Sequence, residues 1–224
     1  MAYILHIETS TKVCSVALSE NGKLLALKEG EEDGYSHGEN LTLFIEDVLK
    51  TAQLTLRKID AVSVASGPGS YTGLRIGVST AKGICYPLGI PLIAIDSLTS
   101  LSELARIKHP SSTLCALIDA RRMEVFSCIF SQNEEQIKPI SADIIEQNTY
   151  KQYEPYIFFG DGAEKLIEIW SGNNCKADLT IASSATGQLK IAYEKFLKEQ
   201  FEDVAYFEPY YLKDFVSTSK KVQS

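Results

Sequence analysis

The sequence lacks the features that would place the chain in a membrane or export it. Its longest uncharged stretches, residues 61–74 and 83–95, are interrupted by glycine and proline and fall short of the ~20 apolar residues that a membrane-spanning helix needs. Residues 1–8 contain no basic segment and reach Glu8 before any long apolar run, so we expect no secretory signal peptide. These absences predict a cytoplasmic protein without a membrane partner.

Cysteines and basic residues are also scarce. The five cysteines (Cys14, Cys85, Cys115, Cys128 and Cys175) are odd in number and irregularly spaced, which fits neither a disulfide framework nor a zinc site. We expect them to be small apolar residues of the interior. Lys and Arg total 22 against 29 Asp and Glu, a formal net charge of -7. A protein that grips phosphate backbones alone carries the opposite balance, so any role with nucleic acid must be shared with a partner.

The composition that remains is that of an ordinary globular protein of 224 residues, 45% apolar and 23% charged. Three antiparallel strands are expected at residues 3–7, 14–18 and 23–27, with Asn21-Gly22 as a hairpin turn between the last two. The acidic run Glu29, Glu31, Glu32 and Asp33 is expected to be a solvated loop. These residues open an α/β fold.

Helices and strands then alternate. The apolar positions from Leu41 to Ala52 share one helical face, and Ser36 with Glu39 could form a capping box. A strand at residues 61–65, a helix at 72–86 and a strand at 91–95 imply a parallel crossover. Strands are expected again at 114–118, 125–130 and 156–159, and a last helix at 185–197. We expect two α/β domains, residues 1–100 and 101–224, with the boundary near residues 97–112.

The segment Gly67-Pro68-Gly69-Ser70-Tyr71-Thr72-Gly73, followed by Leu74 and Arg75, is the most informative part of the chain. It contains no lysine, so it is not a Walker A phosphate loop. Its glycines also miss the spacing of a dinucleotide-binding fingerprint, because the sixth position is Thr72. A tight turn leading into a helix N-terminus remains. It could hold an anion near Arg75, or it could simply be a packed turn.

The helix at 72–86 is apolar almost all round, which predicts burial on more than one side. Its small residues lie on one narrow face, and the neighbouring helix from Leu41 carries Leu43 on its otherwise polar side. The second neighbour of this helix is either part of the same core or another subunit. The predicted interface consists of Leu41, Leu43, Phe44, Ile45, Val48, Gly73, Gly77, Thr80, Ala81 and Ile84.

Four stretches carry a family resemblance: ILHIETSTKVCSVAL at residues 4–18, IDAVSVASGPGSYTGLRIG at 59–77, LIDARRMEV at 117–125 and Gly160-Asp161-Gly162-Ala163. In order and spacing they resemble the TsaB family, also called YeaZ. Residues 209–213 resemble the closing motif of that family, with Lys213 in place of Arg. The resemblance implies an actin-like, sugar-kinase-like fold of two βββαβα-type domains.

The resemblance also implies a function. Members of this family are non-catalytic dimerisation subunits in the formation of threonylcarbamoyladenosine beside the tRNA anticodon. Their partners are the catalytic subunit TsaD and the ATPase TsaE, and a homodimer is the usual form of the isolated subunit. We therefore expect tRNA contact through the complex only, and no cofactor beyond a nucleotide (ATP or ADP) shared at a subunit interface.

The phosphate-binding turns of actin-like ATPases are incomplete in this sequence. Glu8-Thr9-Ser10 has Glu8 where the family usually has Asp, and the second turn, Asp119-Ala120-Arg121-Arg122, has no glycine. Without glycine the backbone cannot easily approach a phosphate. We expect at most a vestigial phosphate site at Glu8, Thr9, Ser10 and Asp119, with Asp119 and Arg121 as turn and ion-pair residues.

No catalytic or metal-binding residue is predicted. His6, His37 and His109 cannot pair on one helix face, and no nucleophile elbow is present. Gly160-Asp161-Gly162 is expected to be a strand-to-helix turn and N-cap rather than an adenosine site. The alternative functions are a glycoprotease-like hydrolase, which needs a nucleophile or metal ligands, and a small-molecule kinase, which needs glycines in the second turn.

Overall fold

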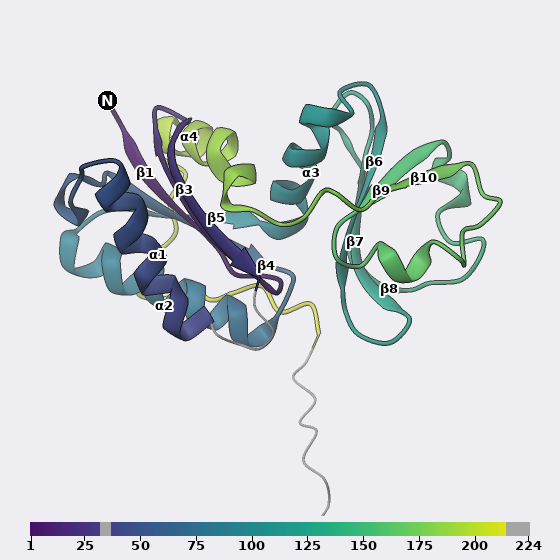
Figure 1. Ribbon diagram of the computed structural model, residues 1–224, viewed down its shortest axis with the longest axis horizontal. Helices are drawn as coiled ribbons and strands as arrows, with labels where there is room; N and C mark the ends of the chain where they lie inside the picture. The colour runs from purple at the N-terminus through teal and green to yellow at the C-terminus, as the bar shows by residue number, and fades with distance from the viewer. Residues whose placement is uncertain (32–36, 214–224) are drawn as a thin grey trace, which may run out of the picture.

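The computed structural model describes residues 1–31 and 37–213 and consists of two lobes, each built on a five-stranded mixed sheet (Figure 1). The first sheet has the strand order β3-β2-β1-β4-β5. Its strands are β1 (Tyr3–Glu8), β2 (Val13–Glu20), β3 (Lys23–Glu31), β4 (Ala61–Gly67) and β5 (Leu92–Asp96). The first three are antiparallel, whereas β4 pairs with β1 and β5 pairs with β4 in parallel. The predicted strands of this half are confirmed.

The turn between β2 and β3 has the expected chemistry. Asn21 and Gly22 both have positive φ, 49° and 76°, as the central residues of a type I′ turn require. The strand after this turn is longer than predicted. Glu29 and Glu31 belong to β3 rather than to a loop, and the Glu29 carboxylate accepts hydrogen bonds from Ser15 at 2.9 Å and Ser184 at 2.8 Å. Glu32 and Asp33 lie outside the described residues, as does Ser36 of the predicted capping box.

Three helices cover the two faces of this sheet (Figure 1). On one face lie α1 (His37–Thr51) and α2 (Tyr71–Leu88), joined to the sheet by a core that contains Leu41, Val48 and Val78. On the other face lies α4 (Leu189–Leu197), whose Ala192 packs with Ile4 and Ile93. The central strand residues are therefore buried on both sides, which explains why β1 and β4 are apolar along most of their length.

The second sheet repeats the order of the first, β8-β7-β6-β9-β10. Its strands are β6 (Thr113–Asp119), β7 (Glu124–Phe130), β8 (Gln136–Ile144), β9 (Tyr156–Phe159) and β10 (Cys175–Asp178). The predicted echo of the first half is thus present. Its crossovers differ, since the short 3-10 turns η2 (Lys151–Tyr153) and η3 (Glu164–Leu166) stand where the first lobe has α1 and α2. The helix expected after Gly162 is only η3.

Two segments cross between the lobes and pack against each other. One is α3 (Ser97–Lys108), and the other leads from β10 through η4 (Ala185–Gln188) to α4. A Cβ at Gly187 would collide with the backbone oxygen and hydroxyl of Ser100, so glycine permits this close contact. No sequence pattern indicated α3, which lies in the expected domain boundary. The division at residue 100 stays a prediction, but α4 belongs to the core of the first sheet.

The last described residues, 204–213, form a turn followed by an irregular segment, and we call this whole stretch the strap. Lys82 of α2 donates to the backbone oxygens of Ala205 at 3.0 Å and Phe207 at 3.1 Å. Farther along, Leu212 packs against the core of the second lobe, and Lys213 forms an ion pair with Glu124 of β7. The strap is therefore a third connection between the lobes. Among the described residues, no helix is long and apolar enough to cross a membrane.

Candidate functional site at the Gly-Pro-Gly loop

The Gly-Pro-Gly loop lies where the first turn, α2 and the strap meet. The Ser70 backbone N–H donates to the Ser10 carbonyl oxygen at 2.6 Å. A Cβ at Gly69 would lie 2.8 Å from the Ser10 side chain and would collide with the same carbonyl. The glycine is therefore needed for the approach of a neighbouring backbone, and the Ser70 N–H is already bonded to the Ser10 carbonyl.

The other glycine of the loop faces the strap. Gly67 has φ +106°, a value that L side chains rarely adopt, and a Cβ there would lie 2.6 Å from the Tyr210 carbonyl oxygen. The Tyr210 N–H in turn donates to the Ser66 carbonyl at 2.7 Å. Of the two interpretations left open by the sequence, the packed turn is the one observed.

The N-terminus of α2 is also held by hydrogen bonds and close contacts within the protein. The Ser70 hydroxyl caps the helix by accepting from the Gly73 N–H at 3.3 Å. Thr9 donates its hydroxyl to the Gly73 carbonyl at 2.8 Å. A Cβ at Gly77 would collide with that same hydroxyl and touch Val64 at 3.5 Å. The small-residue face of α2 is thus the face that packs on its own sheet.

This packing corrects part of the predicted interface. Six of its residues are buried in the first lobe and are not available to another subunit: Leu41, Ile45, Val48, Gly73, Gly77 and Ala81. The others reach the surface. Leu43 is 56% exposed, and Phe44, Thr80 and Ile84 are partly exposed. Gly83, which no sequence pattern singled out, is exposed and has open space where an alanine would place its Cβ.

Glu8 lies at the end of a fully buried network of hydrogen-bonded polar side chains. Ser63 donates its hydroxyl to Gln188 Oε1 at 2.7 Å, so it accepts from His6 Nδ1, also at 2.7 Å. His6 is therefore neutral with its proton on Nδ1, and its Nε2 accepts from Ser19 at 2.7 Å. Gln188 Nε2 donates to the Ile7 carbonyl at 2.9 Å and reaches Glu8 Oε2 at 3.5 Å. The place of His6 in a strand was predicted, but Gln188 was missed because it is 125 residues from Ser63.

Burial shifts the pKa values of the two titratable groups in this network, His6 and Glu8. It lowers the pKa of His6 to about 3 and raises the pKa of Glu8 above its usual value. Glu8 Oε1 accepts from the Ser10 N–H at 2.8 Å, so its carboxylate shapes the turn. Glu8, Thr9 and Ser10 are all buried. The Glu8 carboxylate, the Thr9 hydroxyl and the Ser10 backbone are hydrogen-bonded within the protein, whereas the buried Ser10 hydroxyl has no hydrogen-bond partner among the described residues. The geometry gives Glu8 and Thr9 a structural role in the turn.

The second turn lies on the other lobe and is mostly exposed. Asp119 forms an ion pair with Lys165 and accepts from the Arg121 N–H at 3.0 Å, as expected for a turn and ion-pair residue. Asp161 accepts from the Asp119 N–H at 2.9 Å instead of capping a helix, which corrects the N-cap assignment. Desolvation, and then the charge of Asp119, raise the pKa of Asp161. The two lobes approach here, since Lys12 of the first turn acts on Asp161 electrostatically.

Arg75 joins the loop to the strap. Its guanidinium lies 4.2 Å from the Tyr71 ring centroid, and its Nε donates to the Tyr211 hydroxyl at 3.2 Å. The Tyr71 and Tyr211 ring centroids are 4.6 Å apart. The hydrogen bond to Tyr211 is the main cause of a raised Arg75 pKa. An arginine stacked on tyrosine keeps its charge and a preset orientation.

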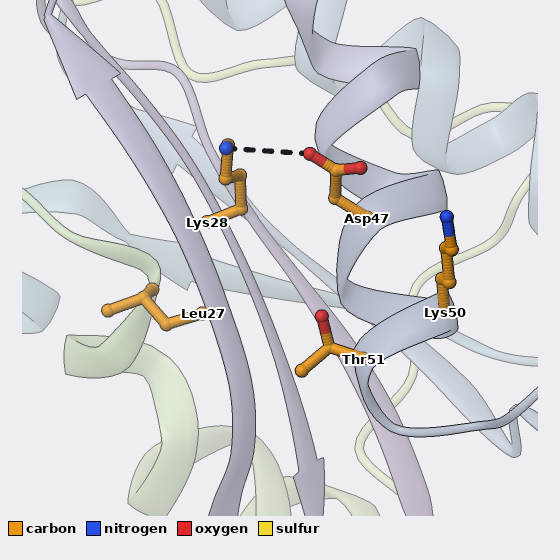
Figure 2. A pocket seen from close by; sticks show the side chains of 5 residues that line it. All are labelled: Leu27, Lys28, Asp47, Lys50 and Thr51. Atoms are coloured by element: carbon orange, nitrogen blue, oxygen red, sulfur yellow. Dashed lines mark ion pairs between the residues drawn. The ribbon is translucent and has the colours of Figure 1, made fainter.

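The cysteines are not joined in disulfides. Cys14, Cys85, Cys115 and Cys128 are buried, Cys175 is partly exposed, and all five are free thiols. Within residues 1–31 and 37–213 no group of three His, Cys, Asp or Glu side chains could hold a metal ion. A hollow beside α1, between Leu27, Lys28, Asp47, Lys50 and Thr51, is bridged by the Lys28–Asp47 ion pair at 3.5 Å (Figure 2). It brings together exposed groups of both charges and lies away from the loop.

The two lobes are built on sheets of the same strand order, and the first turn of one lobe faces the second turn on the other. This arrangement defines an actin-like, sugar-kinase-like fold. An activator of the 2-hydroxyisocaproyl-CoA dehydratase from Clostridium difficile, solved with bound ADPNP, shares the fold with a TM-score of 0.53 at 8% identity over 90% of this chain and 98% of that one. A closer structural match is YeaZ from Pseudomonas aeruginosa, with a TM-score of 0.81 and 24% identity over 95% of this chain and all (100%) of that one.

Sequence comparison identifies the family. Residues 31–217 match the family model described as TsaD, tRNA N6-adenosine threonylcarbamoyltransferase. The tRNA threonylcarbamoyladenosine biosynthesis protein TsaB of Escherichia coli is 27% identical over 97% of both chains, and that of Bacillus subtilis is 30% identical over 70% of both. The chain belongs to the TsaB (YeaZ) family, within the group that the TsaD model describes.

Proposed function

We propose that this chain is a non-catalytic subunit in the formation of threonylcarbamoyladenosine in tRNA. The observation that carries the proposal is the hydrogen bond from the Ser70 N–H to the Ser10 carbonyl, because it commits a backbone donor at the start of α2 to the chain's own backbone. Curated relatives across the length of the chain are named for this biosynthesis. The protein acts in the cytoplasm and contacts tRNA only within a complex.

The partners are a TsaD-type catalytic subunit and a TsaE-type ATPase, and the isolated chain forms a homodimer. The proposed contact is the outer face of α1 and α2, with Leu43, Phe44, Thr80, Gly83 and Ile84. A glycine inside an exposed helix costs ~1 kcal/mol relative to alanine, and the open space at Gly83 gives no reason for it within the chain. Close approach of a second helix supplies that reason. Any ATP or ADP is shared at a subunit interface.

Reconstitution tests the function. The purified chain, the sister subunit, the ATPase, unmodified tRNA and the small substrates should yield the modified nucleoside, detected by mass spectrometry of digested tRNA, and omission of this chain should abolish it. The chain alone should not turn over ATP. Modification at the full rate without the chain would contradict the proposal, as would ATP turnover by the chain alone that Glu8→Ala removes.

Light scattering tests the interface. Leu43→Glu and Gly83→Leu should weaken association with the sister subunit while circular dichroism remains that of the parent. The matched control is Leu179→Glu, since Leu179 is also an exposed leucine, at 48%, but lies in the second lobe after β10. Equal association of all three variants would place the contact elsewhere on the molecule.

A further inference from the structure

The arginines of the chain are few and unevenly placed. Two of the five lie elsewhere: Arg57 is on η1 (Leu56–Lys58), and Arg106 on α3 donates to two backbone oxygens. The other three, Arg75, Arg121 and Arg122, are exposed near the place where the first turn and the second turn approach each other. The strap connects these three, because Tyr211 contacts Arg75 and Lys213, two residues farther, contacts Glu124 beside the second turn. We call Arg75, Arg121 and Arg122 the arginine cluster.

The backbone of the second turn has positive φ at two of these arginines, a conformation that is unfavourable for residues with a side chain. Arg121 and Arg122 have φ of 69° and 53°, in the left-handed region where an L side chain is strained and glycine or asparagine is usual. Burial does not offset this cost, since both side chains are exposed. The guanidinium groups of both residues are accessible at this strained turn, so a partner molecule can reach them.

Among the charged groups near the cluster whose contacts are described here, basic groups outnumber acidic ones, although the whole chain is acidic. Two carboxylates are matched by lysines, Asp119 by Lys165 and Glu124 by Lys213. A third, Asp161, lies near Lys12, and a fourth, Glu208, acts on Arg75. With the three arginines of the cluster, the basic groups in this set outnumber the acidic ones. The excess is local, in a chain with a net charge of -7.

We propose that the arginine cluster contacts the phosphate backbone of tRNA when this subunit stands in its complex; the inference rests on the proposed function. Guanidinium groups bind phosphate oxygens in pairs of parallel hydrogen bonds. Tyr210, 53% exposed on the strap and adjacent to Tyr211, which contacts Arg75, offers a ring on which an unpaired base can stack. A free nucleotide is a poorer ligand, because the Ser70 N–H at the start of α2 is already bonded to the Ser10 carbonyl.

The test uses the reconstituted complex and a variant that should not disturb folding. Arg121→Asn with Arg122→Gly places residues that favour positive φ in the turn, so the midpoint of urea unfolding should stay the same or rise. The affinity of its complex for tRNA should nevertheless fall about tenfold or more at 0.1 M salt, and the slope of log K against log salt should shrink by about 1.5–2. Arg75→Gln should show a smaller loss.

The control removes two charges elsewhere. Arg57→Gln with Lys58→Gln alters neighbouring exposed residues on η1, which precedes β4 and so lies at the opposite end of that strand from the Gly-Pro-Gly loop. It should leave the affinity and its salt dependence unchanged. Light scattering on every complex shows whether assembly is intact, which separates this test from that of the proposed function.

Two outcomes would overturn the inference. Unchanged tRNA affinity and salt slope in an intact Arg121→Asn, Arg122→Gly complex would show that the cluster makes no phosphate contact. Loss of complex assembly, with tRNA affinity kept in the fraction that assembles, would assign the cluster to a protein partner instead of tRNA.

Discussion

The carbonyl oxygen of Ser10 lies 2.6 Å from the backbone nitrogen of Ser70, and this hydrogen bond joins the first turn of the molecule to the start of α2. The two partners come from distant parts of the sequence. Gly69 makes the approach possible, because any side chain there would collide with Ser10. The loop that looks like a phosphate cradle is therefore an internal joint, and its glycines serve packing.

Gly69→Ala should destabilise the chain by about 1–3 kcal/mol, the usual cost of forcing atoms into a filled site. Urea unfolding followed by circular dichroism measures the change. Gly38→Ala is the control, since Gly38 at the start of α1 has open space around it, and alanine favours helix. Equal stability of the two variants would mean that the joint is looser than the structure indicates.

Two glycines of α2 should respond in opposite directions. Gly77→Ala displaces the Thr9 hydroxyl and its bond to the Gly73 carbonyl and should cost about 1–3 kcal/mol. Gly83→Ala should stabilise the isolated chain by up to ~1 kcal/mol, because its surroundings are open. Denaturant midpoints of both variants decide this. A stabilising Gly77→Ala would contradict the assignment of this face to the core.

His6 makes stability depend on pH. Its pKa is about 3 in the folded chain and near 6.5 when unfolded. A lowered pKa means that its contribution is complete above pH 6.5 and is lost as the pH falls toward 3. At pH 5 the loss is about 2 kcal/mol. The raised pKa of Glu8 acts in the opposite direction, so the measurement must be a difference between variants.

The difference is that between the parent chain and His6→Asn. At pH 7 the variant should be less stable, because Ser19 and Ser63 lose a partner. The gap in unfolding free energy should narrow by about 2 kcal/mol at pH 5, since only the parent must keep a buried histidine neutral. A gap that stays constant between pH 7 and pH 5 would show that His6 titrates normally in the folded chain.

The second lobe contains an ion pair that should contribute more to the free energy of unfolding than the ion pairs on the surface do. Lys138 Nζ lies 2.8 Å from Asp143 Oδ2, with side chains 11% and 25% exposed. Burial acts to raise the pKa of Asp143, but hydrogen bonds from Lys138, Ser127 and Tyr150 outweigh it and lower the pKa to about 2. Asp143→Asn leaves a shielded lysine without its partner charge and should cost about 2–3 kcal/mol.

The matched control for that pair is Asp47→Asn. Its ion pair with Lys28 at 3.5 Å is about half exposed (47% and 53%), and such pairs contribute about 0–1 kcal/mol. Thermal unfolding of both variants at one ionic strength gives the comparison. Equal effects would mean that the second-lobe pair is as solvated as the surface one.

Sequence patterns predicted the strands and helices that have clear periodicity and missed those that do not. The core helix α3 carries several serines, Ser97, Ser100 and Ser102, and β8 contains Lys138 and Pro139, residues that are unusual in strands. The short strand β10 has no buried residue. Each of these elements is held by tertiary packing or by pairing with one neighbour, which local propensity does not report.

The candidate site shows the same limit. The first turn, the Gly-Pro-Gly loop and Asp119 were found because they are short motifs. The partners of these motifs come from distant segments, such as Tyr210 for Gly67 and Thr9 for Gly77, so the sequence could not tell an inward glycine from an outward one. The arginine cluster was equally hidden, since it combines α2 with a turn of the other lobe.

The return of α4 to the first sheet has a consequence for synthesis. Ile4, Ala61, Ile93 and Ile95 form an apolar face that Ala192 and its neighbours cover. The sheet is complete at Asp96, but α4 begins only at Leu189, so the ribosome must add another 93 residues (189 minus 96) before the cover exists. At about 5–20 residues per second this takes roughly 5–20 s. The nascent chain thus exposes an apolar surface during this time. Binding of a chaperone to that surface matters most in this interval.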